Sequence, residues 1–279
     1  MDEKSLIVFE GKNIRRVFQD ERWWFSVIDV IGVLTDSLDA RNYWKVLKNR
    51  LGKEGSEVVT KCNQLKLESH DGKKYLTDVA DIEGLFRIIQ SIPSPKAEPF
   101  KRWLARVGYE RVMEIEDPEL AGTRMKEIYK QKGYSGEWIE KRVRGVAVRN
   151  ELTDEWKKRG VKQKLGFAIL TNEISKATFG LTVGEYKKEK NLDRQNLRDH
   201  MDDMELILTM LGEATTTRLT KTRDSKQFPG LKRDAKDGGK VAGSTRKDIE
   251  KRLGKSIVSK QNYLNEPEGI MRKKLNNGK

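Results

Sequence analysis

The sequence predicts an α+β fold: a mixed N-terminal domain, then a mainly α-helical domain, then a basic flexible tail. Within the first 115 residues, apolar positions switch between the two-residue spacing of strands and the three-to-four-residue spacing of helices. From residue 118 onward the strand pattern is largely gone, and after about residue 220 the chain becomes rich in Gly, Lys and Asp. We therefore expect domains at 1–115 and 116–219, and a partly disordered tail at 220–279.

The N-terminal domain is predicted to contain short antiparallel strands. The turn-like residues 19–21 favour a hairpin between the two runs that flank them, and Asp71-Gly72 is a strong hairpin-turn signal. Strands are expected at residues 5–9, 13–18, 22–26, 57–67 and 74–77.

A pair of short helices is expected between these strands. Apolar residues from Val27 to Leu34 share one helical face, and Asp39 is a plausible N-cap for a second helix over 40–51. Two helices around a turn of about four residues have the dimensions of a helix-turn-helix. Further helices are expected at 78–91 with an Asp78 cap, and at 100–114, 118–132, 135–150, 153–159, 163–178, 182–190, 194–219 and 245–254.

Composition indicates a soluble protein of the cytoplasm. Charged residues make up 36% of the chain and the mean hydropathy is −0.76. No apolar run approaches the roughly 20 residues that span a bilayer, and the N-terminus lacks the pattern of a secretory signal. Cys62 is the only cysteine, which excludes an internal disulfide and fits a reducing compartment.

The net charge of +14 is unevenly distributed. Residues 1–115 carry 20 Lys and Arg against 18 Asp and Glu, and residues 116–212 carry 19 against 17. Residues 213–279 carry 18 against 8. A basic tail on near-neutral domains favours an arm that strengthens binding to a polyanion, although a merely solvating tail has the same composition.

The best candidate for DNA contact is the helix expected at 40–51. With Tyr43, Trp44, Leu47 and Leu51 packed inward, its opposite face is polar and basic. Arginine and asparagine side chains suit bidentate contacts with base edges, whereas lysine mainly meets phosphate. An ordinary amphipathic helix with a solvated basic face is the alternative. The candidate residues are Arg41, Asn42, Lys45, Lys48 and Asn49.

A second candidate is the Pro-rich entry and helix at 93–108. Lys101, Arg102 and Arg106 could bind phosphates there, while Phe100 and Trp103 are expected in the core. Dibasic and tribasic clusters in the tail form a third candidate, at 232–233, 246–247, 251–252 and 272–274.

Enzyme interpretations find little support. His70 and His200 are the only histidines, and with one cysteine they cannot build a Cys/His zinc site. GGKVAG at 238–243 has the composition of a phosphate loop, but no Gly-Lys-Ser/Thr closes it. Four acidic residues on the helix expected at 194–219 could hold a hard cation, as in a metal-dependent nuclease, but a solvated acidic face explains them better. They are Asp199, Asp202, Asp203 and Glu205.

Several separated motifs resemble a known family. WWFSVIDVIGVLTDS (23–37), ARNYWKVLKNRL (40–51) and YLTDVADIEGLFRIIQSIPSPKAEPFKRWLARVG (75–108) resemble, in order and spacing, the BRO family N-terminal domain of phage antirepressors and large DNA-virus proteins. The continuation is similar to the bacterial DNA-damage-inducible protein D family, in DPELAGTRMKEIYKQKGYSGEWIEKR (117–142) and NLRDHMDDMELILTMLGEATTTRL (196–219). The resemblance implies an α+β domain that binds DNA or acts in repressor control, linked to the DNA-damage response or prophage regulation. It brings no catalytic residues.

We therefore expect a non-enzymatic DNA-binding regulator without cofactor or metal. The partner is duplex or single-stranded DNA, and a homodimer that reads two half-sites is compatible with it. The rival hypothesis is a protein-interaction modulator that binds a recombinase filament or a repressor, with its charge used for docking.

Overall fold

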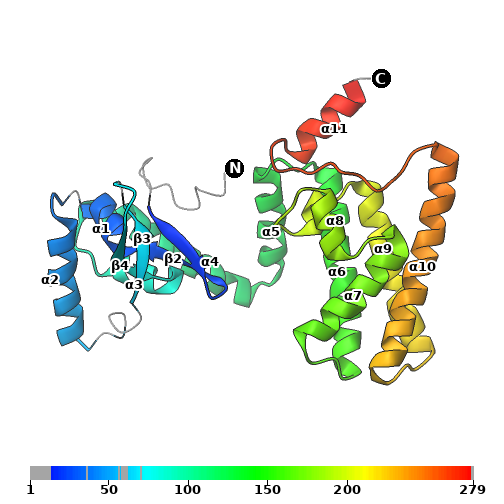
Figure 1. The fold of residues 1–279 in the computed structure, drawn as a ribbon, viewed down its shortest axis with the longest axis horizontal. Coiled ribbons are helices and arrows are strands. Elements are labelled where there is room, and N and C mark those ends of the chain that lie inside the picture. Colours follow the sequence, from blue (N-terminus) through cyan, green and yellow to red (C-terminus); the bar gives the residue numbers. More distant parts are fainter. Residues whose placement is uncertain (1–13, 36, 56, 58–61, 70, 278–279) are drawn as a thin grey trace. The chain divides into compact units, whose positions relative to one another are not determined.

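The computed structural model describes residues 14–35, 37–55, 57, 62–69 and 71–277. The chain divides into two compact units, Met1–Leu120 and Ala121–Lys279. The first combines a sheet with helices and the second is helical, as the α+β prediction required (Figure 1). The strand expected at 5–9 lies outside the described residues.

The first unit contains a four-stranded antiparallel sheet in the order β1-β2-β4-β3. β1 and β2 form a hairpin whose two turn residues, Asp20 and Glu21, both have positive φ, as a type I′ turn requires. β4 pairs with β2 on one side and β3 on the other, so that Phe25 lies opposite Ala80 and Lys66 opposite Leu76. The strands are β1 (Arg16–Gln19), β2 (Arg22–Ser26), β3 (Asn63–Glu68) and β4 (Lys74–Ala80).

Alternation along the strands gives the sheet two apolar faces. Phe25 and Ala80 belong to the main core, which they share with the helices of the unit. Their neighbours Trp24 and Val79 belong to a smaller cluster with Leu67. The helices are α1 (Val27–Thr35), α2 (Ala40–Lys53), α3 (Ile82–Gln90), the 3₁₀ turn η1 (Pro95–Ala97) and α4 (Glu98–Glu116).

Two details of this unit differ from the sequence prediction. Asp78 is not a helix cap but lies in β4, and the cap of α3 is Asp81, whose Oδ1 accepts the amide of Gly84 at 2.9 Å. Of the two aromatic residues of α4 expected in the core, Phe100 and Trp103, only Phe100 is buried. Phe100 is in the core, but Trp103 and Val107 are 48% and 41% exposed.

The second unit is built from helices that run alongside one another. α10 packs against α7 and α9, and α6 packs against α9 (Figure 1). The elements are α5 (Glu119–Gln131), α6 (Gly136–Lys158), α7 (Lys164–Phe179), α8 (Val183–Glu189), η2 (Leu197–His200), α9 (Asp203–Thr222), α10 (Gln227–Leu253) and α11 (Glu268–Asn277).

The prediction of a flexible tail after residue 220 is wrong for residues 227–253. They form one helix of 27 residues, α10, whose residues Leu231, Ala235 and Ala242 are completely buried. The Gly-rich run that suggested a loop lets helices approach closely: a Cβ on Gly239 would lie 2.7 Å from Cβ of Ala177 on α7. The helical domain therefore does not end at residue 219.

Two other helix predictions also need correction. The segments expected at 135–150 and 153–159 are one continuous helix, α6. The helix expected at 194–219 is divided into η2 and α9. Asp202 caps α9 in a reciprocal capping box with Glu205, which fixes its start.

Candidate nucleic-acid interface

Helix α2 is held in the first unit by one apolar side. Its first turn is capped by Asp39, whose Oδ1 accepts the amide of Asn42 at 2.9 Å. Trp44, Leu47 and Leu51 are buried in the main core at helical spacing. These three buried side chains fix the orientation of the helix, as the sequence periodicity predicted, and the other side of the helix faces solvent.

Four of the five candidate residues lie on that exposed side. Arg41, Asn42, Lys45 and Asn49 are all exposed. Arg41, Lys45 and Asn49 follow one another at four-residue intervals and form a single stripe. Among the described residues, neither Arg41 nor Lys45 has an ion pair, so both cations are available to an external anion.

The fifth candidate, Lys48, already has a partner within the domain. It is half-buried, and its Nζ lies 3.0 Å from Oδ2 of Asp78 on β4. The same oxygen accepts the indole N–H of Trp44 at 2.7 Å, and the other carboxylate oxygen accepts the amide of Gln64 at 2.9 Å. Lys48 therefore anchors α2 to the sheet, whatever further contact it makes.

The environment of Asp78 keeps it ionised. Burial by itself raises the pKa of this carboxyl, but the hydrogen bonds from Trp44, Gln64 and Lys48 outweigh burial and lower the pKa below its usual range. A charged Asp78 is a strong acceptor for all three donors. The anchor of α2 is thus electrostatic as well as apolar.

The structure extends the basic stripe to residues that the sequence analysis missed. Lys53 is exposed and continues the four-residue spacing from Asn49. Its signal was present in the same periodicity, but the helix was expected to end at residue 51. At the other end of the stripe, the hydrogen bond that Tyr75 donates to Asp71 raises the pKa of Tyr75. The positive charge of Arg41 is close enough to oppose this rise. Exposed Lys74 precedes Tyr75 on β4.

The candidates on α4 form a separate group. Lys101 is half-buried and donates to the backbone carbonyl of Ile92 at 2.8 Å, so it closes the loop after α3. Arg102 and Arg106 are exposed on the same helix. Trp103 and Val107, which alternate with them, are exposed too, so this face of α4 is mixed rather than simply basic.

In the second unit, three of the four basic clusters expected on a tail lie on α10, and the fourth, 272–274, lies on α11, where Arg272 pairs with Asp203 and Glu268. On α10 the cluster members Lys232, Arg246 and Arg252 have carboxylate partners in Glu173, Glu250 and Asp248. Five exposed basic residues recur at three-, four- or seven-residue spacing along this helix. Among the described residues, only Lys240 in this set has an ion pair, with Asp237 at 3.6 Å. The five are Arg233, Lys236, Lys240, Lys247 and Lys251.

The four acidic residues considered as a metal site do not converge. Asp202 caps α9, and Glu205 is buried against Tyr186 and Lys190. Asp199 accepts the guanidinium of Arg142 at 2.9 Å.

Asp203 has partners of its own, Arg272 at 2.9 Å and Lys141 at 3.0 Å. Burial raises the pKa of Asp203, but these two cations outweigh it and lower the pKa below its usual value. Within the described part of the chain, no group of three or more His, Cys, Asp or Glu residues could hold a metal ion.

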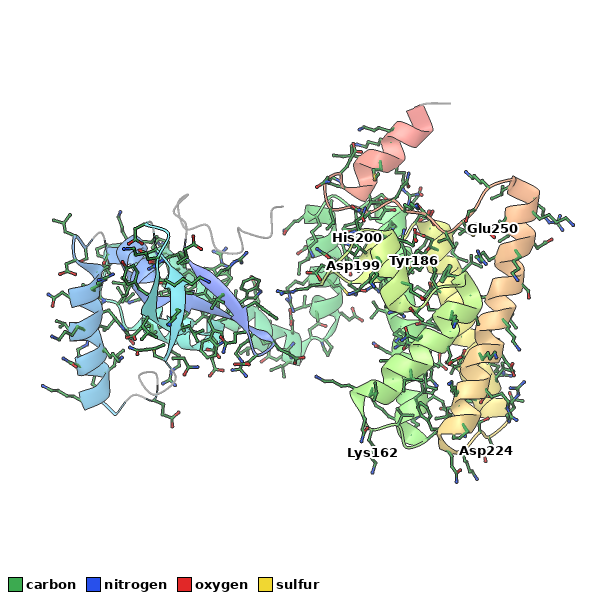
Figure 2. The ribbon with its side chains drawn as sticks, viewed as in Figure 1. Lys162, Tyr186, Asp199, His200, Asp224 and Glu250 are labelled. Carbon is green, nitrogen blue, oxygen red and sulfur yellow. The ribbon has the colours of Figure 1, made fainter. Side chains whose placement is uncertain are left out.

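His200 lies near one end of the helical unit. Figure 2 shows Tyr186, Asp199 and His200 near one end, and Lys162 and Asp224, from the connections that flank α7 and α10, at the other. His200 is buried, and its Nδ1 accepts the backbone amide of Tyr263 at 3.0 Å. This histidine is a structural acceptor that ties the segment before α11 to η2.

A comparison with known protein families finds a match to the first unit of the chain. Residues 13–112 match the model of the BRO family, N-terminal domain, a domain associated with regulators of the phage antirepressor type. The match covers the sheet, α1–α3 and most of α4, so this part of the chain is similar to the BRO N-terminal domain. No curated protein matches the chain. Among the described residues, no helix is both long and apolar enough to cross a membrane.

Proposed function

We propose that the chain is a DNA-binding regulator that contacts DNA through the exposed side of α2. One observation carries this proposal: Arg41, Asn42, Lys45 and Asn49 share the solvent side of a helix whose other side is anchored in the core. A helix with this division can enter a groove without disturbing the fold. The match to the BRO N-terminal domain supports the same function.

The side chains on α2 suit two kinds of contact. Arg41 and the two asparagines can read base edges through paired hydrogen bonds. Lys45 and Lys53 suit phosphate, which positions the helix without reading sequence. α1 and α2 are separated by residues 36–39, a connection of helix-turn-helix length, and we propose that α2 is the recognition helix of the pair.

We further propose that α10 supplies non-specific affinity. Its basic stripe runs from Arg233 to Lys251, which at the rise of an α-helix is about 27 Å. A rigid row of this length can meet several phosphates of one backbone, since each strand of duplex DNA carries one charge about every 3.4 Å of the helix axis. In this proposal a folded helix supplies the non-specific DNA affinity that the sequence analysis expected from a flexible tail.

The biological role that we propose is regulation without catalysis, in a prophage or in the response to DNA damage. The BRO match supports a regulator of the antirepressor type. The link to DNA damage rests on the resemblance of residues 117–142 and 196–219 to the DNA-damage-inducible protein D family.

A second candidate function is modulation of a recombinase filament or a repressor by direct binding. The exposed apolar side chains of α4 favour it. Trp103 and Val107, one turn apart on the same face of α4, are 48% and 41% exposed, and exposed apolar groups that lie together are typical of protein contacts. If this second function is the true one, DNA affinity is weak, and replacing Arg41 and Lys45 on α2 by alanine leaves function intact.

Salt-titrated binding to duplex and single-stranded DNA tests the proposal. We compare the wild-type chain with Arg41→Ala/Lys45→Ala and with Arg233→Ala/Lys247→Ala. Lys157→Ala/Lys158→Ala, near the end of α6, removes the same charge elsewhere and serves as the matched control. The proposal expects the α2 variant to lose affinity and sequence preference, and the α10 variant to lose affinity for all sequences equally. No measurable binding at low salt, or equal losses in the α2 variant and the control, would contradict it.

A further inference from the structure

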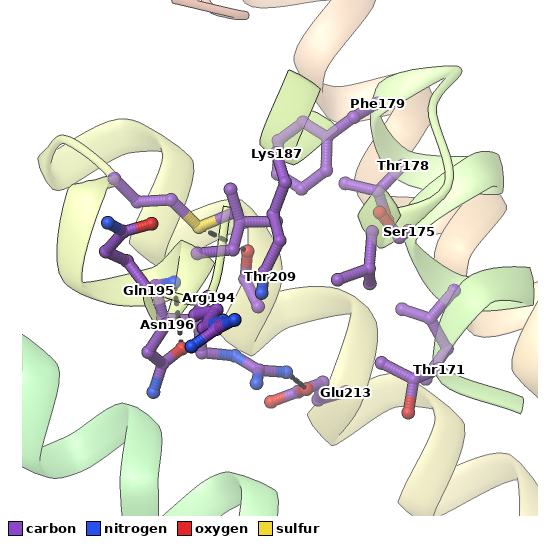
Figure 3. A pocket seen from close by; sticks show the side chains of 15 residues that line it. Thr171, Ser175, Thr178, Phe179, Lys187, Arg194, Gln195, Asn196, Thr209 and Glu213 are labelled. Atoms are coloured by element: carbon purple, nitrogen blue, oxygen red, sulfur yellow. Dashed lines mark hydrogen bonds and ion pairs between the residues drawn. The ribbon is translucent and has the colours of Figure 1, made fainter. Parts of the chain in front are cut away.

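The charged groups around a cavity of about 220 Å³ in the helical unit are mostly matched within the chain. The cavity lies between α7, α8, η2 and α9 (Figure 3). Its carboxylate, Glu213, accepts the guanidinium groups of Arg198 and Arg149, and Arg194 lies 3.8 Å from the carboxylate of Asp193. The solvent side of α2 in the first unit differs, because it presents polar groups that the fold does not use.

Both flanks of α2 are tied to the rest of the first unit. On one flank, Lys48 pairs with Asp78 of β4 at 3.0 Å. On the other flank, the guanidinium of Arg50 donates to the backbone carbonyl of Ser91, at the end of α3, at 2.7 Å. These contacts leave the ridge between the two flanks, opposite the core, as the part of α2 that can approach another molecule.

The centre of this ridge is formed by two neutral amides. At the 100° per residue of an α-helix, Asn42 and Asn49 lie within about 20° of the direction opposite to the buried face. Both are exposed, and among the described residues neither side-chain amide has a hydrogen bond. Arg41 lies toward the sheet instead, where its charge acts on Tyr75 of β4. Each free amide offers two donors and an acceptor.

An apolar side chain lies beside these amides. Val46 is 62% exposed and does not belong to the core of the unit. It follows Asn42 by four residues, so the two side chains are neighbours on the helix surface. This part of the ridge therefore presents a hydrogen-bonding group and an apolar group side by side.

This combination matches one kind of base pair in the major groove. Adenine presents an acceptor and a donor that asparagine contacts with two hydrogen bonds, and thymine presents a methyl group that apolar side chains contact. Cytosine is read by carboxylates, and guanine by arginine or lysine. No carboxylate lies on the ridge. Lys45 lies to one side of its centre and Lys53 at its C-terminal end, where each suits a phosphate.

We propose that the ridge of α2 reads A·T base pairs, with Asn42 and Asn49 on adenine and Val46 against the methyl group of thymine. The two asparagines are two helical turns apart and meet separate base pairs. This inference rests on the DNA contact by α2 proposed above. It adds the class of base pair that is read and a further specificity-determining residue, Val46.

Selection from a pool of random duplexes, with the full chain at low salt, tests the base preference. The bound duplexes should be enriched in A·T pairs, and Asn42→Ala/Asn49→Ala should remove the enrichment. Fluorescence anisotropy with one selected duplex then measures affinity. Asn42→Ala should weaken binding by about fivefold or more, the lower end of the effect of a bidentate base contact.

Replacement of thymine by uracil in the same duplex tests the contact of Val46, because uracil lacks only the methyl group. Wild type should bind the uracil duplex about fourfold more weakly, the value of one buried methyl group. Val46→Ala should bind the two duplexes equally, since the methyl group has lost its contact. Val112→Ala, at a valine of α4 that is 53% exposed, is the matched control and should discriminate as wild type does.

Three results would overturn the inference while leaving DNA binding by the chain in place. They are selection of G·C-rich duplexes, selection without any base preference, and equal discrimination against uracil by wild type and Val46→Ala. Absence of DNA binding at low salt would instead overturn the proposed function and this inference together.

Discussion

Lys190 and Glu205 form an ion pair at 3.0 Å with side chains that are 1% and 0% exposed. The same groups hold the segment between α10 and α11, because Lys190 donates to the carbonyl of Gln261 and Glu205 accepts the amide of Ser259. A buried pair of this kind contributes little net stability by itself, but removal of one partner leaves an uncompensated charge.

Lys190→Met should therefore lower the free energy of unfolding by about 3–5 kcal/mol. It should also increase proteolysis between residues 255 and 264. Urea unfolding and limited trypsin digestion measure the two effects. Lys188→Met, two residues earlier on the exposed side of α8, should change neither. A loss below about 1 kcal/mol for Lys190→Met would show that water or another donor replaces the ammonium.

The first unit was largely predictable because its signals are local. Strand alternation, the Asp39 cap and the helical spacing of Trp44, Leu47 and Leu51 are all read within a few residues. The role of Asp78 was not predictable. Its partners Trp44, Lys48 and Gln64 are 34, 30 and 14 residues away, and an aspartate before an apolar run resembles a cap.

The exposed part of the candidate interface was also predictable, since one face of an amphipathic helix defines the other. Arg41 and Lys45 are exposed because Trp44 and Leu47 are buried. The partner of Lys48 was not predictable, since Asp78 belongs to the distant strand β4. Tertiary contacts decide which lysines and arginines lack an ion pair.

The same limit explains the error in α10. Gly238, Gly239 and Gly243 have poor helix propensity, so the run indicated a loop. These glycines allow α10 to approach α7 and α9 closely. Sequence periodicity does not show such an approach.

Gly239→Ala should consequently destabilise the helical unit despite the higher helix propensity of alanine. The new Cβ would lie 2.7 Å from both Ala177 Cβ and the backbone oxygen of Ile174, and overpacking of this kind costs about 1–3 kcal/mol. Gly122→Ala on α5 is the matched control, because nothing lies within 4 Å of its added Cβ. That change should stabilise the protein by about 0.5–1 kcal/mol. Urea unfolding of both variants decides the matter, and a stabilising Gly239→Ala would contradict close packing.

Stability should fall in mild acid because of His200. Burial lowers the pKa of His200 below its ordinary value of 6.5, although Asp199 opposes the shift. The folded state thus favours the neutral ring. Its contribution is complete above about pH 6.5 and is lost as the pH falls toward the lower pKa of the folded state. Protonation of Nδ1 also removes the acceptor of the Tyr263 amide.

Urea unfolding at several values between pH 5 and pH 8 measures this dependence. His200→Gln keeps an acceptor but cannot titrate, so its stability should vary less over the same range. An identical pH dependence in wild type and variant would assign the effect to another group.

Lys45 and Lys48 should respond differently to the same substitution, although they are three residues apart on α2. Lys45→Met removes an exposed cation without an ion pair among the described residues. We expect unfolding stability to change by less than about 0.5 kcal/mol. If Lys45 meets a phosphate, the slope of log K against log salt should fall by about 0.9.

Lys48→Met instead removes the cation from Asp78 and should lower stability by about 1 kcal/mol. The effect is modest because Lys48 is 36% exposed and solvent screens the pair, and because Trp44 and Gln64 still donate to Asp78. Its salt slope should stay close to that of the wild type. Urea unfolding and salt-titrated DNA binding on both variants give the comparison. Equal falls in salt slope would show that Lys48 leaves Asp78 to reach a phosphate, and would place Lys48 on the DNA beside Lys45.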